Sequence, residues 1–241
     1  MRESATPEFY IDDHAVLFGL LAKNAETACG RFGLDAVDRA VVSYGRERGQ
    51  RGAMRCLRDG RELTLKNYML YGEWLDPCKW SEARIAALAP DYTTRMVRCG
   101  WNETWKKYGL GQYGKIYCKW IDHELLYGFN PDLKLEMPSF LSYGDAACEF
   151  RWIGCAYQDE AELARMTDLR SQAAPGVVKD FLYHCGHLLS TFKRELCREL
   201  GIPKGDEVLA NALAEYVELF GDEKKARIVR ESGRNFMTID D

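Results

Sequence analysis

A helix is predicted between Ile116 and Tyr127, where apolar residues recur at helical spacing. The segment contains neither proline nor glycine, and its apolar positions include Tyr117, Trp120, Ile121 and Leu125. Gly128 and the Asn130-Pro131 pair follow. Because glycine accepts a left-handed cap and the residue before proline avoids helical geometry, the helix should end there and the chain should turn sharply.

Two strands joined by a turn are predicted directly after this helix. In the first strand, Leu133, Leu135 and Met137 alternate with Lys134, Glu136 and Pro138. In the second, Ala146, Cys148, Phe150 and Trp152 share one face, and Tyr143-Gly144-Asp145 forms the turn between the strands. The upstream segment Tyr92 to Arg98 is also β-prone, so we expect it to join the hairpin in one antiparallel sheet.

Amphipathic helices are predicted on both sides of this central region. His14 to Cys29 carries apolar residues at helical spacing, and Asp35 can cap a second helix that runs towards Arg58. Glycines at 45, 49 and 52 weaken that helix and favour close packing, so the segment GRERGQR at 45–51 is interpreted as a solvated or packing face. Residues 178–228 show a similar helical pattern.

These elements indicate an α+β fold with helical N- and C-terminal segments around a central antiparallel sheet and a helix-plus-hairpin core. The predicted organisation is an N-terminal helical segment over residues 1–75, a central α+β core over 76–160 and a C-terminal helical segment over 161–241, folded as one compact unit. Within the core, the stretch from Asp76 to Pro90 is expected to form a short helix between its prolines.

Charge and hydropathy narrow the range of partners. The 241 residues carry a formal net charge of -4, which gives no electrostatic reason to expect nucleic acid. No apolar run approaches the roughly 20 residues that span a bilayer. The N-terminus MRESATPEFYIDD also lacks the basic-then-apolar pattern of a secretory signal. A cytoplasmic protein that does not bind membranes is therefore expected.

Nine cysteines are many for this length, but their number is odd and their spacings contain no CxxC. No disulfide framework is therefore predicted, and most of these residues should act as small apolar side chains. Cys99, Cys118 and Cys148 are set apart as candidates for chemistry. Glu103 could supply a carboxylate near Cys99, although the tryptophans around it are more often core residues than a stacking platform.

Two histidines are candidate ligands of a metal ion. His184 and His187 are three positions apart on a predicted helix and could share a ligand sphere. The segment lacks an HExxH motif and a clear third ligand, so a structural role is preferred. No metal or other cofactor is predicted.

Asp122 is the first candidate for acid–base chemistry. It lies beside Trp120 and Ile121 on a largely apolar helix, so partial desolvation could raise its pKa. The alternative is a surface carboxylate or a helix-packing hydrogen bond. Cys118 lies one turn earlier on the same face and could be a nucleophile or line a pocket. His123 points roughly 100° away around the helix, which makes it a poor partner for Cys118 but leaves it as a candidate substrate contact.

Each of four further candidates has a simpler structural interpretation. Asn130 could anchor a ligand carboxylate or amidine, or it could only make the turn. Glu136 lies on the opposite strand face from the apolar residues and points either into a cavity or to solvent. Asp145 is most simply a turn residue. Cys148, on the apolar face, is most simply a core residue.

Four short motifs follow one another between Gly114 and Trp152: a YC-x3-D helix, a GFNP turn, an L-x-LE strand and a GD-x2-C-x-F strand. Their positions are Tyr117-Cys118 with Asp122, Gly128 to Pro131, Leu133 to Glu136, and Gly144-Asp145 with Cys148 and Phe150. This ordered set resembles the L-2-amino-thiazoline-4-carboxylic acid hydrolase family. The resemblance extends less specifically to Arg98–Leu110 and to the helical flanks.

The resemblance implies a cofactor-independent hydrolase acting on a small cyclic amidine or isothiourea. For L-2-amino-thiazoline-4-carboxylate, the product would be N-carbamoyl-L-cysteine. Such a reaction needs an acid at the ring nitrogen and a base that activates water for attack at C2. Under this interpretation Asp122 acts with Glu136 or Asp145, and Asn130 orients the substrate. Cys118 or Cys99 contacts its sulfur.

A second interpretation is a non-catalytic module that binds or senses a small molecule. An acidic residue before a GD-x2-C-x-F strand is similar to the 4-vinyl reductase domain, a ligand-binding fold found in sensory and tetrapyrrole contexts. Fold alone does not fix function, so tight binding without turnover would favour this alternative. The helical flanks are compatible with a homodimer in either case.

Overall fold

The computed structural model describes residues 7–239, which pack into two compact units. Of the described residues, unit 1 contains 7–44, Gly100–Ile121 and Asp180–Phe236, and unit 2 contains Gly45–Cys99, Asp122–Lys179 and 237–239. Residues 1–6, which begin the stretch predicted to lack a secretory signal, and residues 240–241 lie outside the described part. The predicted three-part division at residues 75 and 160 stays a prediction.

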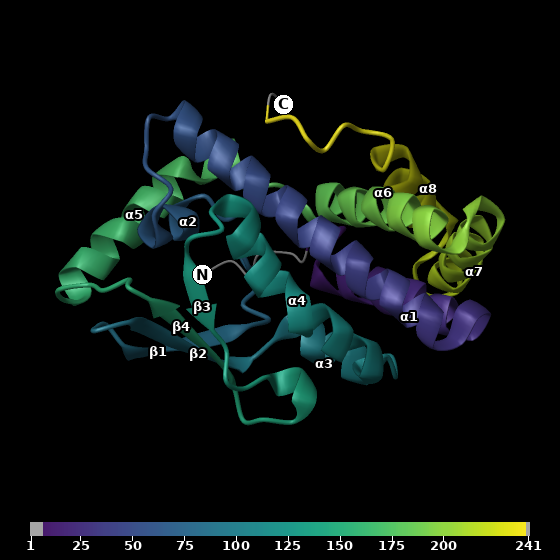
Figure 1. The fold of residues 1–241 in the computed structure, drawn as a ribbon, viewed down its shortest axis with the longest axis horizontal. Coiled ribbons are helices and arrows are strands. Elements are labelled where there is room, and N and C mark those ends of the chain that lie inside the picture. The colour runs from purple at the N-terminus through teal and green to yellow at the C-terminus, as the bar shows by residue number, and fades with distance from the viewer. Residues whose placement is uncertain (1–6, 240–241) are drawn as a thin grey trace. The chain divides into compact units, whose positions relative to one another are not determined.

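The elements are labelled in Figure 1. The helices are α1 (Ile11–Arg58), α2 (Leu65–Leu70), α3 (Gly100–Lys107), α4 (Gly111–Phe129), α5 (Glu160–Val177), α6 (Phe181–Leu200), α7 (Ile202–Phe220) and α8 (Asp222–Glu231), with a short 3-10 helix at Leu141–Tyr143. The strands are β1 (Glu82–Ala87), β2 (Tyr92–Arg98), β3 (Lys134–Glu136) and β4 (Cys148–Ile153). Among the described residues, none of the helices has both the length and the apolar character needed to cross a membrane.

The break between the two predicted N-terminal helices lies at Gly30. Its φ of 56° falls in the left-handed region, which glycine adopts without a steric penalty, and helical geometry resumes directly after it. The prediction that Asp35 caps the second helix is wrong. Asp35 lies inside the helix, where it accepts a hydrogen bond from Arg31 Nε at 2.9 Å, one turn earlier.

Unit 1 is helical and has an aromatic core. Phe18 of α1 meets the rings of Trp105, Tyr117 and Phe192 edge-on, with centroids 4.9 to 5.9 Å apart. Trp105 is fully buried and donates its indole N–H to the Ala15 carbonyl at 2.8 Å, so the prediction that it is a core residue is confirmed. Helices α6, α7 and α8 pack against one another, which confirms the predicted C-terminal helices.

Unit 2 contains one antiparallel sheet of four strands in the order β1-β2-β4-β3 (Figure 1). Trp152 of β4 lies opposite Tyr92 of β2 on one side and opposite Leu135 of β3 on the other. The predicted hairpin, and its union with the Tyr92–Arg98 strand, are therefore confirmed. The α+β fold class is confirmed as well, while the likeness to 4-vinyl reductase domains stays a prediction.

Strand β1 replaces the short helix predicted over residues 76–90, and that prediction is wrong. The strand sequence EARIAA is rich in residues that prefer helices when isolated. Its backbone nevertheless pairs with β2, placing Arg84 opposite Arg95 and Ile85 opposite Thr94. Pairing with a neighbouring strand overrides the local preference of such a short segment.

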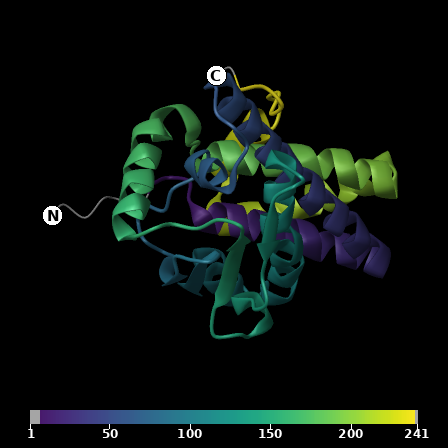
Figure 2. The same cartoon turned by 60° about the vertical axis from the view of Figure 1, so that its left-hand side comes forward.

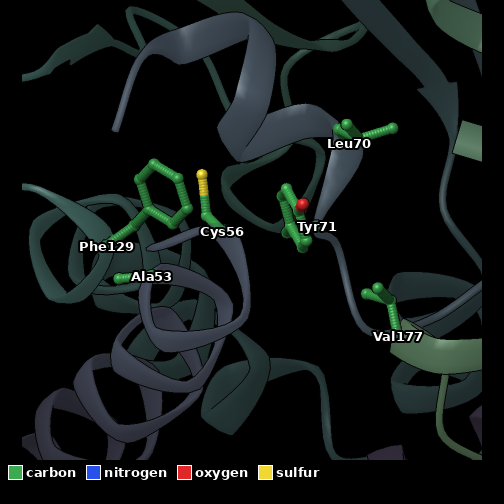
Figure 3. Close-up of a cluster of buried hydrophobic side chains, with 6 residues drawn as sticks. All are labelled: Ala53, Cys56, Leu70, Tyr71, Phe129 and Val177. Carbon is green, nitrogen blue, oxygen red and sulfur yellow. The ribbon is translucent and has the colours of Figure 1, made fainter. Parts of the chain in front are cut away.

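A hydrophobic cluster joins the helices of unit 2. It consists of Ala53, Cys56, Leu70, Tyr71, Phe129 and Val177. In the view of Figure 3, the Cys56 thiol lies between the rings of Phe129 and Tyr71. Figures 1 and 2 both show α2 and α5 side by side, and these two helices are in contact. The cluster fixes the second part of α1 against the ends of α2 and α4.

Glycines allow α1 and α4 to approach closely within unit 2. A Cβ atom on Gly49 would lie 2.1 Å from the carbonyl oxygen of Leu125, and one on Gly52 would lie 3.4 Å from Phe129 Cδ2. The prediction that glycines of the second N-terminal helix favour close helix packing is confirmed for these two positions.

Candidate active site

Unit 2 contains a cavity of about 230 Å³ whose wall combines charged and aromatic side chains. The wall is formed by the second part of α1, the end of α2 with the segment after it, the second part of α4, and α5. Its polar and aromatic members include Arg48, Tyr68, Glu73, Trp74, Asp122 and Arg170. A cavity of this volume is smaller than a typical site for a drug-sized ligand and suits a small molecule.

Asp122 supplies a carboxyl group to this cavity from α4. Its side chain is half-buried and lines the cavity wall. Burial raises the pKa of Asp122 to about 6, and the positive charge of Arg48 acts in the opposite direction. A carboxyl group with this pKa can both accept and return a proton near neutral pH. The desolvation predicted for Asp122 is thus found, while its catalytic role stays a prediction.

A buried ion cluster backs the wall that carries Arg48. Arg48, Arg51 and Arg55 lie three and four residues apart on α1, and they bind Glu73 at 3.4, 2.7 and 2.8 Å. All four side chains are at most 2% exposed, so solvent screens these charges weakly. One carboxylate therefore holds three guanidinium groups within this cluster. Among the described residues, Arg55 Nε and Nη2 have no hydrogen-bond partner.

Two contacts hold the segment that follows α2. The guanidinium of Arg48 stacks over the ring of Trp74, 3.9 Å from its centroid. Arg170 of α5 donates hydrogen bonds to the carbonyls of Met69 and Trp74, the latter at 3.0 Å. Because Glu73 lies between these two anchored residues, Arg170 helps to fix the carboxylate that binds the arginines.

The neighbouring hydroxyl and thiol groups hold their protons tightly. Burial raises the pKa of Tyr68, and the negative charge of Asp122 adds to the shift. Burial, together with a hydrogen bond to Asp59, raises the pKa of Tyr71 to about 12. Burial raises the pKa of Cys148 to about 11, with a further contribution from Asp122. Of these groups and Asp122, only Asp122 titrates near neutral pH.

The other predicted catalytic carboxylates do not line the cavity. Glu136 is 61% exposed and pairs with Arg151 at 3.2 Å, so the solvent-facing alternative is found. Asp145 accepts a hydrogen bond from the backbone N–H of Phe140 at 2.8 Å, as a turn residue does. Their catalytic roles stay predictions.

Asn130 and Cys148 are used by the local structure. Asn130 accepts a hydrogen bond from the Asp132 N–H at 3.0 Å within the turn and donates one to the Leu63 carbonyl at 2.9 Å, which ties the turn to the segment before α2. Cys148 is buried on β4, where its sulfur accepts from the Leu141 N–H at 3.2 Å. Their predicted contacts with substrate stay predictions.

The remaining candidates are divided between the two units. Cys118 and Glu103 belong to unit 1, where Cys118 is half-buried on α4 and Glu103 is 60% exposed and pairs with Lys106 at 3.8 Å. His123 and Cys99 belong to unit 2, are half-buried and do not line the cavity. The structure therefore brings only Asp122 of the predicted residues to this wall.

The histidine pair of α6 is packed among aromatic rings of unit 1. His187 stacks on Phe236 with centroids 4.8 Å apart and lies 4.7 Å from the ring of Tyr44. His184 is fully buried beside Phe181. Within residues 7–239, no three His, Cys, Asp or Glu side chains are grouped in a way that could hold a metal ion.

In a comparison with protein families, residues 11–152 match the model described as L-2-amino-thiazoline-4-carboxylic acid hydrolase. This range covers more than half of the 241 residues. The chain belongs to the L-2-amino-thiazoline-4-carboxylic acid hydrolase family. The resemblance stated from the sequence motifs is thereby confirmed. Comparison with curated proteins and with solved structures finds no match.

Most of the cavity wall lies within residues 11–152, the region that matches the thiazoline-carboxylate hydrolase family. Arg48, Glu73 and Asp122 fall inside the matched residues, whereas Arg170 on α5 falls outside them. The acid and the ion cluster thus come from the family region. The side chain that anchors the segment around Glu73 comes from beyond it.

Reasoning from the sequence misses the ion cluster of this family member. GRERGQR is interpreted from the sequence as a solvated or packing face, and for Arg48 and Arg51, which are 2% and 0% exposed, the packing alternative is found. Charged residues are seldom fully buried unless they are paired, which is why the solvated interpretation is the default. A usable signal exists, because the three arginines form a single stripe on a helix whose neighbouring face carries the packing glycines.

Proposed function

We propose that the chain is a cofactor-independent hydrolase that opens the ring of a small cyclic amidine or isothiourea. The model substrate is L-2-amino-thiazoline-4-carboxylate, with N-carbamoyl-L-cysteine as the product. The observation that carries the proposal is the carboxyl group of Asp122, whose pKa is about 6 and which lines a cavity of about 230 Å³. Family membership supports hydrolysis, and the cavity volume supports a small substrate.

In the proposed mechanism Asp122 moves two protons in succession. As a carboxylate it accepts a proton from the water whose oxygen bonds to C2, and it passes that proton to the ring nitrogen. It then accepts the proton of the new C2 hydroxyl group. As the C2–S bond breaks and the C2–O bond becomes a carbonyl, it delivers this second proton to the departing sulfur. One water is added overall, and Asp122 ends as the carboxylate.

In this mechanism Asp122 alone carries out both proton transfers, whereas the sequence predicts two acid–base groups. The proposal does not use Glu136 or Asp145, because neither lines the cavity. Tyr68 lines the wall with its hydroxyl group protonated, and it supplies a hydrogen-bond donor for the substrate. A homodimer, a cytoplasmic location and the absence of a nucleic-acid partner stay predictions.

The test is thiol release from L-2-amino-thiazoline-4-carboxylate by the purified protein, measured with and without a chelator. We expect Asp122→Asn to lower kcat/KM by about 10² to 10⁴. In the unchanged protein kcat/KM should rise as the pH passes about 6, because the base must be ionised, and this rise should vanish in Asp122→Asn. Glu124→Gln is the matched control, since Glu124 is also on α4 but pairs with Arg46 at 2.6 Å and does not line the cavity.

The outcomes separate the two functional classes. Full activity in Asp122→Asn would remove Asp122 from the mechanism. Tight binding of the ring without turnover in the unchanged protein would instead identify a non-catalytic binding module.

A further inference from the structure

Unit 2 contains a second cavity, of about 170 Å³, which the proposed hydrolysis does not use. Its wall is formed by α2, β2, the segment after β4, and α5. The apolar and aromatic side chains of this wall are Met69, Leu70, Tyr92, Tyr157, Leu163 and Met166. An apolar cavity of about 150 Å³ holds one benzene ring, so the second cavity has room for a single ring.

The two cations of this wall are held by other groups. Lys66 binds Glu162 at 2.5 Å and lies 4.9 Å from the centroid of the Tyr157 ring. Arg170 donates hydrogen bonds to two backbone carbonyls around the end of α2. Burial raises the pKa of Tyr92 and of Tyr157, so both hydroxyl groups stay protonated. Among the described residues no carboxylate lines the second cavity, so its wall favours an uncharged ligand.

The hydroxyl group of Tyr157 has weak hydrogen-bond partners. It donates to Met69 Sδ at 3.6 Å and also interacts with the thiol of Cys155. Sulfur is a weak acceptor, whereas the oxygen of a ligand would be a stronger acceptor for the same proton. Thioethers such as Met69 and Met166 also make favourable contacts with the edges of aromatic rings. The wall therefore suits an aromatic ring that carries an oxygen.

We propose that the second cavity binds a small uncharged aromatic ligand that carries an oxygen acceptor, such as a phenol. Met69 and Arg170 line both cavities, whereas Met166 lines the second cavity and not the one that contains Asp122. The site is therefore separate from the proposed catalytic centre and adjoins it. Its ligand is not the substrate of the ring-opening reaction, so either proposal can fail without the other.

The first test is a titration with phenol, which is uncharged at neutral pH, followed by NMR of methionine methyl groups labelled with ¹³C. The variants Met69→Leu, Met96→Leu and Met166→Leu assign the resonances. We expect binding in the millimolar range, as is usual for so small a ligand, with saturable shifts of the Met69 and Met166 resonances. The resonance of Met96, which lines neither cavity, should not move. A shift of Met69 without Met166 would place phenol in the first cavity and overturn the proposal.

The second test compares ligands in Tyr157→Phe. Loss of the hydroxyl donor should weaken phenol binding about 2- to 10-fold and leave the binding of toluene unchanged, because toluene has a methyl group in place of the oxygen. Benzoate, which adds a negative charge to the ring, should bind to the unchanged protein more weakly than phenol does. Equal losses for phenol and toluene, or tighter binding of benzoate than of phenol, would contradict the proposed ligand class.

The third test fills the second cavity from α5. Met166→Trp should abolish phenol binding, because the larger side chain takes the place of the ring. Leu169→Trp is the matched control, since Leu169 is on the same helix and lines neither cavity, and it should bind phenol like the unchanged protein. If Met166→Trp does not unfold cooperatively, Met166→Phe replaces it and should weaken phenol binding. Undiminished binding in the Met166 variant, or an equal loss in Leu169→Trp, would reject the site.

Discussion

Asp122 is ionised at neutral pH within a wall that disfavours its charge. Burial shifts its pKa from 3.8 to about 6, which corresponds to roughly 3 kcal/mol at about 1.4 kcal/mol per unit. Asp122→Asn should therefore raise the free energy of unfolding above pH 7 by up to roughly 3 kcal/mol. The folded protein binds this proton more tightly than the unfolded chain, so the advantage of Asn should shrink as the pH falls through about 6 and disappear below about 4. Urea unfolding at several pH values measures this gain in stability. A gain that does not change with pH would contradict a raised pKa for Asp122.

Glu73 is a second residue whose charge decides stability. It is the shared partner of Arg48, Arg51 and Arg55, so Glu73→Gln leaves buried cations without their carboxylate. We expect a loss of about 3 to 5 kcal/mol in the free energy of unfolding. The exposed pair of Glu82 and Arg84 provides the control, because Glu82→Gln should change the free energy of unfolding by less than about 1 kcal/mol. Comparable losses in the two variants would mean that burial does not strengthen the cluster.

The two residues also differ in how far the sequence predicts them. Asp122 stands among apolar residues on a helix with a clear period, so its desolvation can be inferred locally. Glu73 lies between α2 and β1, where no periodicity applies, and its partners come from a distant part of the chain. Its burial depends on tertiary packing, which a single sequence does not display.

At the scale of elements, the crossing of α1 and α4 within unit 2 depends on Gly49. Gly49→Ala would place a methyl group 2.1 Å from the Leu125 carbonyl oxygen, so the helices would have to separate. We expect the free energy of unfolding to fall by about 1 to 3 kcal/mol, which is measured as a lower midpoint of thermal unfolding. Gly52→Ala is the matched control, because its new methyl group would meet Phe129 at an ordinary 3.4 Å and the helix would gain from alanine. A midpoint for Gly49→Ala at or above that of Gly52→Ala would show that the contact does not limit the packing.

Long periodic elements are predicted well, and elements that depend on their neighbours are not. Helix α4 is uninterrupted by proline or glycine between Ile116 and Tyr127, so its period is visible in the sequence. Strand β1 is short and helix-prone, and only its pairing with β2 makes it a strand. The break in α1 lies at Gly30, which adopts a positive φ without a steric penalty, and Asp35 lies inside the helix that follows.

At the scale of the molecule, each unit is assembled from stretches that are distant along the chain. The family match ends at residue 152, before α5 and the three helices that follow it. A chain of residues 1–152 would lack Phe192 of the unit 1 core and Arg170 of the cavity wall. We expect it to unfold without a cooperative transition and to bind hydrophobic dyes, as incompletely packed chains do. A sharp thermal transition in this fragment would show that the matched region folds alone.

Because Arg48 stacks on Trp74, the fluorescence of Trp74 should report whether the cavity is occupied. Indole emission responds to charge lying against the ring, and the guanidinium lies 3.9 Å from the centroid of Trp74. A ligand that moves Arg48 away from this ring would therefore change its emission. Trp74→Phe separates that signal from the rest of the six tryptophans. Fluorescence can thus distinguish the ligand-bound cavity from the empty one in the unlabelled protein, whether or not the ligand reacts.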